Sequence, residues 1–304
     1  MPAFKLIVLG SDGGPRENNL SGFLLAPFDS TDFITLDAGT LLTGIDIAYR
    51  NHHFADIVFN DRDLTPAGTI FLKHIKAYLI THAHLDHVAA LVFNSQSDIS
   101  KPILALDPTI DNLRDHLFND RIWADFGDEG ENGRKLYHYH RLKPSEKKAI
   151  PGTSMTVEPF PLNHAKHCPS TAFLIEHQEN YLLHFGDTVP DTPSREKRLE
   201  PIWKRITPLL QEKKLKAIVI ECSTPNKQDK SHSHLDPAML LHELRHLQEI
   251  SQTSLKEFTV IVTHRKEILQ KAPDAKALIV AELTRDNDLG VHFLFPEQGH
   301  RLNI

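Results

Sequence analysis

The stretch of sequence that decides the fold is Thr81-His82-Ala83-His84-Leu85-Asp86-His87, which directly follows an apolar run expected to form a strand, 77–80. Side chains two residues apart in an extended segment point the same way, so His82 and His84 can hold one ion. Asp86 and His87 come at the turn into the next helix and can reach a second ion beside the first. Imidazoles and carboxylates that leave room for water suit a hydrolytic metal centre. The alternative is that these are four exposed polar residues of an ordinary loop, and the specific spacing of the potential ligands disfavours it.

The composition agrees with metal or acid–base chemistry. The chain has 304 residues, of which 20 are histidines, and 34 basic against 40 acidic residues give a net charge of −6. This charge does not favour electrostatic capture of a polynucleotide. A hydrophobic content of 40% is that of a globular protein, and the longest apolar runs have the length of strands rather than of membrane spans. With only two cysteines, Cys168 and Cys222, no disulfide framework holds the chain together.

The first ten residues, MPAFKLIVLG, read as an opening strand and lack the basic and long apolar regions of a secretory signal. We therefore expect a cytoplasmic protein, or a periplasmic one if a leader has been removed, with no membrane partner. A homodimer is compatible with the sequence, because dimers are common among soluble enzymes.

Strand-like and helix-like segments alternate from end to end, which predicts an α/β protein with one core and one domain, 1–304. The expected strands are 5–9, 22–25, 33–36, 77–80, 171–175, 181–185, 217–220 and 259–262. The expected helices are 86–95, 109–118, 196–210, 237–251 and 274–283. The polar stretch 141–148 is expected to be a loop. Several strands end in Gly, Asp, His or Thr, where α/β scaffolds place their chemistry.

The His82–His87 motif after a strand resembles the signature of the metallo-β-lactamase superfamily. Four further residues are similar to that superfamily's remaining site residues, in the same chain order: Asp37 in LDAG, His164 in LNH, Asp187 in FGDT and His264 in IVTH. The resemblance implies a four-layer αββα sandwich with a dinuclear site. His82, His84 and His164 would hold one ion, and Asp86, His87 and His264 the other. Asp187 would bridge the ions and Asp37 would support a ligand from behind.

Three other segments resemble the class II 3′,5′-cyclic-nucleotide phosphodiesterases within this superfamily. They are the motif continued to LVFNS at 91–95, the run FNDRIWADF at 118–126, and ECS at 221–223 followed by HSHLDP at 232–237. The N-terminal LGSDGGP at 9–15 also fits. The resemblance implies hydrolysis of cyclic AMP (cAMP), cyclic GMP (cGMP) or both to the 5′-nucleotide by a metal-bridging hydroxide. Zinc is the expected metal, and manganese or iron would be tolerated by the same donors.

We count Asp86 among the catalytic residues because it is an expected metal ligand. The departing 3′-oxygen also needs a proton donor. His234 is the candidate for the proton or for a phosphate contact, with His232 as its competitor and a plain loop histidine as the alternative. Base recognition needs stacking and edge contacts. Asn119 and Trp123, with Phe126, are candidates for that role, although Trp123 fits a core position equally well.

Two motifs have competing interpretations. Gly13-Gly14-Pro15 lets the backbone approach a phosphate or a metal ligand closely, or is a plain tight turn. His242-Glu243-Leu244-Arg245-His246 matches the HExxH signature of zinc proteases. At about 100° per residue, however, both histidines lie away from the apolar stripe of Leu240, Leu244 and Leu247. A solvated helix face is therefore the better interpretation.

Two other functions remain open from the sequence. The first is a ribonuclease Z-like or other phosphodiesterase of the same fold, which the acidic charge and the FN–IW segment disfavour and salt-sensitive RNA binding would favour. The second is a non-catalytic metal-binding module, which a complete ligand set disfavours. The preference between cAMP and cGMP is not readable from the sequence.

Overall fold

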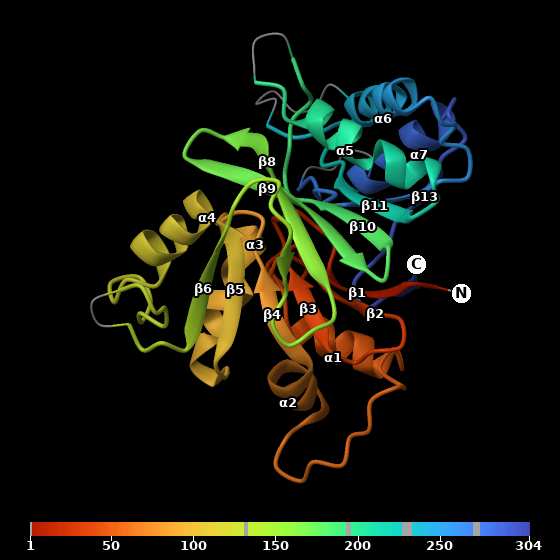
Figure 1. The fold of residues 1–304 in the computed structure, drawn as a ribbon. Helices are drawn as coiled ribbons and strands as arrows, with labels where there is room; N and C mark the ends of the chain where they lie inside the picture. The colour runs from red at the N-terminus through yellow and green to blue at the C-terminus, as the bar shows by residue number, and fades with distance from the viewer. Residues whose placement is uncertain (1, 131–132, 193–195, 227–232, 270–273) are drawn as a thin grey trace.

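In the residues that the computed structural model describes (2–130, 133–192, 196–226, 233–269 and 274–304), two seven-stranded sheets lie face to face (Figure 1). The first sheet has the order β14-β1-β2-β3-β4-β5-β6. Its strands are β1 (Phe4–Gly10), β2 (Gly22–Pro27), β3 (Phe33–Leu36), β4 (Ile75–Leu79), β5 (Lys101–Leu106), β6 (Tyr137–Leu142) and β14 (Arg301–Asn303). The β3, β4, β5 and β6 strands run parallel, so their carboxyl ends meet at one edge.

The second sheet has the order β13-β12-β11-β10-β9-β8-β7. Its strands are β7 (Lys148–Ala149), β8 (Thr156–Ala165), β9 (Cys168–His177), β10 (Asn180–Phe185), β11 (Leu215–Glu221), β12 (Thr259–Thr263) and β13 (His292–Leu294). Here β10, β11, β12 and β13 are parallel and again bring their carboxyl ends together. The stretch 141–148, expected to be a loop, begins with the last two residues of β6 and ends with the first residue of β7. The residues between these strands connect the first sheet to the second.

Helices cover the outer face of each sheet (Figure 1). The first sheet carries α1 (Leu42–Arg50), α2 (Pro66–Thr69), α3 (Leu85–Asn94) and α4 (Asp107–Asn112); π-helical segments, Ile70–His74 and Leu113–Leu117, extend α2 and α4, and the short 3₁₀ turn Ser95–Ser97 follows α3. The second sheet carries α5 (Leu199–Gln211), α6 (Pro237–Ser251) and α7 (Ala275–Arg285). In this described part of the chain, no helix combines the length and the apolar character that crossing a membrane requires.

Three buried clusters correspond to the three interfaces between four layers. One lies between the sheets and includes Leu6, Phe173 and Val219. The other two lie under the helices of the first sheet and of the second sheet. In α6, the predicted stripe of Leu240, Leu244 and Leu247 is fully buried in the second helical layer. The αββα sandwich expected from the sequence is confirmed.

Candidate metal centre

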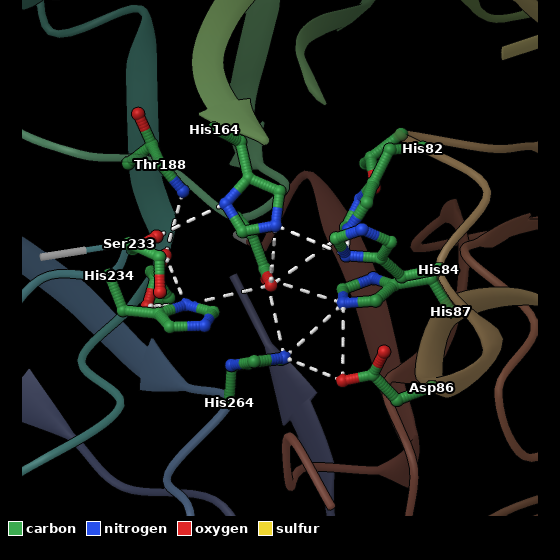
Figure 2. Close-up of polar contacts among 12 residues, drawn as sticks. His82, His84, Asp86, His87, His164, Thr188, Ser233, His234 and His264 are labelled. Carbon is green, nitrogen blue, oxygen red and sulfur yellow. Dashed lines mark hydrogen bonds and ion pairs between the residues drawn. The ribbon is translucent and has the colours of Figure 1, made fainter. Parts of the chain in front are cut away.

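The predicted ligands converge where the carboxyl ends of the parallel strands from both sheets meet. His82 and His84 follow β4, and Asp86 and His87 lie in the first turn of α3. Asp187 follows β10 and His264 follows β12, while His164 lies near the end of β8. Figure 2 shows these side chains facing a common centre, with His82, His84 and His87 opposite His164 and His264.

The first donor group combines three imidazoles and one carboxylate. Its members are His82, His84, His164 and Asp187. The Nδ1 atom of His84 lies 3.1 Å from His82 Nε2 and 3.2 Å from His164 Nε2. Asp187 Oδ2 lies 3.9 Å from His82 Nε2 and 3.7 Å from His164 Nε2. Tetrahedral zinc with bonds of about 2.05 Å places its ligand atoms about 3.3 Å apart, which is close to these separations.

The second donor group uses the other oxygen of the same carboxylate. It consists of Asp86, His87 and His264. The Nε2 atoms of the two histidines lie 3.2 Å apart, and Asp86 Oδ2 is 3.2 Å from His264 Nε2. Asp187 Oδ1 lies 3.2 Å from His87 Nε2 and 3.3 Å from His264 Nε2. Asp187 thus presents one oxygen to each group, which is the arrangement of a bridging carboxylate.

The hydrogen bonds behind the imidazoles fix which nitrogen faces the centre. The Thr81 hydroxyl donates to Asp37 and therefore accepts from His82 Nδ1 at 3.0 Å. The Nδ1 atom of His87 donates to Asp37 Oδ2 at 2.8 Å. The Ser223 hydroxyl donates to Glu221 and accepts from His264 Nδ1 at 2.8 Å. Such partners are typical of metal-ligating histidines.

This arrangement points two ring nitrogens at one another. With their Nδ1 atoms bonded outward to Asp37 and Ser223, His87 and His264 bring their Nε2 atoms within 3.2 Å of each other. Two ring nitrogens this close need a cation between them, either a proton or a metal ion. The two donor groups combine imidazole and carboxylate ligands, and ligands of these two kinds bind divalent first-row metals. The side chains of this centre therefore fit divalent cations.

Electrostatics point the same way. Burial lowers the pKa of His82 and His84 below the usual value, and it lowers the pKa of His164 to about 4. These imidazoles are thus neutral and ready to coordinate. Burial also opposes a charge on His87, yet Asp187 and Asp37 raise its pKa well above the usual value. The carboxylates of Asp187 and Asp37 therefore favour a positive charge at His87.

A second network runs behind the centre, and sequence analysis gave most of its members no role. The buried carboxylate of Glu221 accepts from Thr188 N at 2.7 Å and from the Ser223 hydroxyl. It lies 3.1 Å from His234 Nδ1, and Lys266 Nζ lies 2.8 Å from His234 Nε2. The signal that could have found Glu221 and Ser223 is their place just at the end of β11, between the strands that lead to Asp187 and His264.

His234 lies at the edge of the metal centre. Its Nδ1 atom is 3.6 Å from Asp187 Oδ2 (Figure 2). Its ring stacks on that of His264, with the two ring centroids 5.3 Å apart. Burial tends to lower the pKa of His234, but the adjacent Glu221 raises it above the usual value. With Asp187 and His264, His234 also forms a third group of potential ligands. Its competitor, His232, lies outside the described residues.

Gly13 supports His264 from the loop between β1 and β2. A Cβ atom on Gly13 would lie 2.2 Å from His264 Cε1, so the backbone packs directly on this imidazole. The buried Asp12 beside it is paired with Lys276 of α7 at 2.6 Å, which holds the loop in place. Of the two interpretations of this glycine-rich turn, the structure favours the close approach to a predicted ligand.

Gly13→Ala is expected to displace the His264 ring and lower kcat by about a hundredfold, because shifts near 1 Å at a catalytic centre have effects of that size. Metal affinity should fall as well, which metal analysis after dialysis measures. Gly68→Ala in α2 is the control, since its Cβ would meet nothing closer than 3.2 Å. Equal activity of both variants would contradict this role of Gly13.

The residues predicted to contact the base lie in the FN–IW loop and are engaged within it. Asn119 accepts hydrogen bonds from the backbone of Arg121 and Ile122 and donates to Asp115 O. The Trp123 indole donates to Ser95 Oγ at 2.9 Å. Phe126 is partly buried and packs against the core of the first helical layer. Substrate contact by these three residues stays a prediction.

The HExxH sequence in α6 is explained by packing. Glu243 is buried and accepts hydrogen bonds from the Trp203 indole at 3.0 Å and from Asp191 N at 3.2 Å. His242 is exposed and His246 is partly exposed, on the solvated side of the helix. The zinc-protease alternative therefore has no support in the site's geometry.

Comparisons with known proteins agree with this geometry. The family model for class-II cAMP phosphodiesterases matches residues 4–299. A 3′,5′-cyclic-nucleotide phosphodiesterase of Aliivibrio fischeri is 38% identical over 99% of this chain and 93% of its own length. A probable 3′,5′-cyclic-nucleotide phosphodiesterase of Yersinia pestis is 37% identical over 98% of this chain and 88% of its own.

Solved structures resemble this one over essentially the whole chain. The crystal structure of unliganded yeast PDE1 superposes with a TM-score of 0.88 at 25% identity and covers 100% of both chains. The metallo-β-lactamase-fold protein YhfI of Bacillus subtilis gives a TM-score of 0.62 at 16% identity, covering 98% of this chain and 99% of its own. The second likeness shows the fold alone.

Proposed function

The chain belongs to the class-II cAMP phosphodiesterase family, and on that premise we propose that it hydrolyses the 3′,5′-cyclic phosphodiester of cAMP, cGMP or both to the 5′-nucleotide. The single observation that carries the proposal is Asp187, whose two carboxylate oxygens face two separate groups of metal donors. That arrangement suits two cations placed to act on one phosphate.

We propose two divalent ions. His82, His84 and His164 would hold the first with Asp187 Oδ2, and Asp86, His87 and His264 would hold the second with Asp187 Oδ1. The first group, with three imidazoles and one carboxylate, favours zinc, and Mn²⁺ or Fe²⁺ are compatible with the same donors. When bound, such ions supply Lewis acidity that makes water more acidic and neutralises charge on the phosphate.

The chain's own residues orient and hold this arrangement. Asp37 fixes Thr81 and His87 by hydrogen bonds of 2.8 to 2.9 Å, and Ser223 fixes His264. Asp37 and His264 both have left-handed backbone conformations, with φ of 58° and 54°. Non-glycine residues held in this region are uncommon and collect at functional sites. These hydrogen bonds and backbone conformations set the direction in which each ligand points.

The departing 3′-oxygen requires a proton, which we assign to the pair formed by His234 and Lys266. Glu221 accepts the Nδ1 hydrogen bond of His234 and raises its pKa. Lys266 Nζ meets the opposite ring atom, Nε2, at 2.8 Å. The pair lies beside the first donor group, since the His234 ring centroid is 5.3 Å from that of His164 and its Nδ1 atom is 3.6 Å from Asp187 Oδ2.

His234→Ala is expected to lower kcat for cAMP by about 10²- to 10³-fold, the usual contribution of a positioned general acid. Hydrolysis of methyl p-nitrophenyl phosphate should fall less than about fivefold, because p-nitrophenolate leaves without a proton. Metal analysis of the same protein separates this role from coordination. A matching loss on both substrates together with loss of metal would instead identify His234 as a ligand.

The experiment that tests the proposed function is chromatography of the products after incubation with cAMP, with cGMP and with a short RNA. We expect 5′-AMP or 5′-GMP and intact RNA. Cleavage of the RNA with both cyclic nucleotides unchanged would replace the proposal by a ribonuclease Z-like activity.

The one-domain organisation, 1–304, also remains our proposal. It is supported by the family match over 4–299 and by a buried cluster that joins the two sheets. Cytoplasmic location and a homodimer stay predictions. Gel filtration with light scattering would determine the assembly.

A further inference from the structure

A cavity of about 380 Å³ lies between the last turn of α1 and the chain that follows this helix. The helix connects β3, through α2, to β4, and these two strands run parallel. It therefore runs back along the sheet, so that its end lies near the amino ends of the strands, away from the carboxyl ends where the predicted ligands meet (Figure 1). The volume falls within the usual range for small-molecule sites, about 300–1,000 Å³.

Most of the cavity wall is aromatic or aliphatic. Phe54 is 2% exposed and Ile57 is 7% exposed, and both belong to the buried cluster under the helices of the first sheet. Tyr49 and Phe59 pack against that cluster, and their rings meet edge to face with centroids 5.0 Å apart. Aromatic rings prefer such edge-to-face or offset contacts. The wall therefore suits a ligand that is itself an aromatic ring.

The segment that forms this wall is fixed at several points. The backbone N–H of His53 donates to Ala48 O at 3.0 Å, and the guanidinium of Arg301 in β14 donates to His53 O at 3.0 Å. Asp56 is ion-paired with Lys5 of β1, a lysine that is only 1% exposed. These contacts hold the segment against the end of α1 and against the edge of the first sheet.

The polar part of the cavity is positively charged. Arg50 and His52 both line it, and of the described lining residues none is acidic. The Nε atom of Arg50 donates to the backbone carbonyl of Asp46 at 3.2 Å, and within the described chain no carboxylate forms an ion pair with this guanidinium. Burial lowers the pKa of the adjacent His53, and the basic residues around it lower this pKa further; they are Arg301, His300 and His52. An anion is therefore the charge that this surface favours.

Two features oppose an anion here, and both are offset. The end of a helix carries partial negative charge on its free carbonyls. In α1, however, the carbonyls of Ala48 and Tyr49 already accept hydrogen bonds from the two residues that follow Asn51. The carboxylate of Asp56 lies in the same segment, but it is paired with Lys5 and lies 3.6 Å from Arg301.

We propose that this cavity is a second ligand site, separate from the metal centre, for a small anion that carries an aromatic ring, of the class of aromatic carboxylates. The ring packs against Tyr49 and Phe59. The carboxylate pairs with Arg50, whose planar guanidinium can hold both oxygens at once. The site uses no residue of the two donor groups, so it stands independently of the proposed hydrolysis.

The test compares two probes that share one ring system, the anion 1-naphthoate and the neutral 1-naphthalenemethanol. Calorimetric titration of the purified protein measures affinity, and shifts of backbone amide signals in NMR spectra locate the bound probe. We expect 1-naphthoate to bind more tightly than the alcohol and to shift the signals of residues 49–59. Arg50→Met keeps the length of the side chain but removes its charge. It should weaken 1-naphthoate by about tenfold, the usual effect of losing a charged hydrogen bond, and leave the alcohol within about twofold.

Arg62→Met is the matched control, since Arg62 is an exposed arginine of the same segment that does not line the cavity. It should bind both probes as the unaltered protein does, and turnover of cAMP should be the same in both variants. The proposal is overturned if 1-naphthoate leaves the signals of 49–59 unshifted, or if it binds Arg50→Met as tightly as the unaltered chain. Equal affinity of the unaltered protein for the two probes would also overturn it.

Discussion

Asp187→Asn is expected to lower kcat for cyclic-nucleotide hydrolysis by about a thousandfold and to reduce metal binding in both donor groups. A thousandfold loss corresponds to about 4 kcal/mol of transition-state stabilisation, within the several kcal/mol that a metal centre supplies. The reason is geometric: Asp187 Oδ1 lies 3.2 Å from His87 Nε2, and Oδ2 lies 3.7 Å from His164 Nε2. Asparagine keeps the shape but removes the negative charge that both groups share.

Steady-state kinetics and metal analysis of the purified variant measure this effect. Asp288→Asn makes the same change at a surface residue whose partner is Arg245, and it should leave activity and metal content as they are. Circular dichroism verifies that each variant is folded. A folded Asp187→Asn protein with undiminished turnover and metal would remove the bridging role from the account.

The second large effect is expected from single-ligand variants that separate the two donor groups. His82→Ala should lose the first ion and His87→Ala the second, each retaining about one ion and losing about 10²- to 10³-fold in kcat. The expectation follows because His82 Nε2 lies 3.1 Å from His84 Nδ1 in the first group, whereas His87 Nε2 lies 3.2 Å from His264 Nε2 in the second.

Metal-to-protein ratios of the two variants, measured beside the unaltered chain, test this separation. His292→Ala, an exposed residue of β13, is the control for loss of an imidazole. Loss of both ions from each variant would mean that the two groups bind their metals as one inseparable unit, contrary to the assignment.

The sequence was most informative where local pattern and chemistry coincide. The strand 33–36 and the helix 237–251 were predicted with the bounds that the structure has, and the other expected strands and helices overlap observed ones. The motif after β4 indicated its own ligands because strand geometry and residue types are both local. His164, Asp187 and His264 came instead from the resemblance, since each alone is an ordinary polar residue at or near a strand end.

Elements without a clean apolar period escaped prediction. The strand β8 contains Pro159 and Pro161, which argue against a strand because proline has no N–H to donate. In the structure β7 pairs with β8 only at Thr156 and Val157. Pro159 and Pro161 lie beyond that pairing, where β8 pairs with β9 on its other side. The helix α1 contains Gly44, whose missing side chain allows contact with the backbone of Leu9 in β1. Both reasons are tertiary and cannot be read from a window of sequence.

The network of Glu221, Ser223 and Lys266 is likewise a product of topology. Glu221 and Thr263 are partners in the parallel pair of β11 and β12, which brings Ser223 to His264 across 41 positions of the chain. The role of the FN–IW loop could not be predicted either. Its asparagine and tryptophan make hydrogen bonds within the fold, and its aliphatic residue Ile122 is 67% exposed.

The measurement that tests the central claim most directly is the metal content of the purified protein, followed together with cAMP turnover through chelation and metal return. The account predicts about two divalent ions per chain, loss of 5′-AMP formation as they are removed, and recovery when Zn²⁺ or Mn²⁺ is added back. Undiminished hydrolysis of cAMP by protein from which all metal has been removed would contradict it.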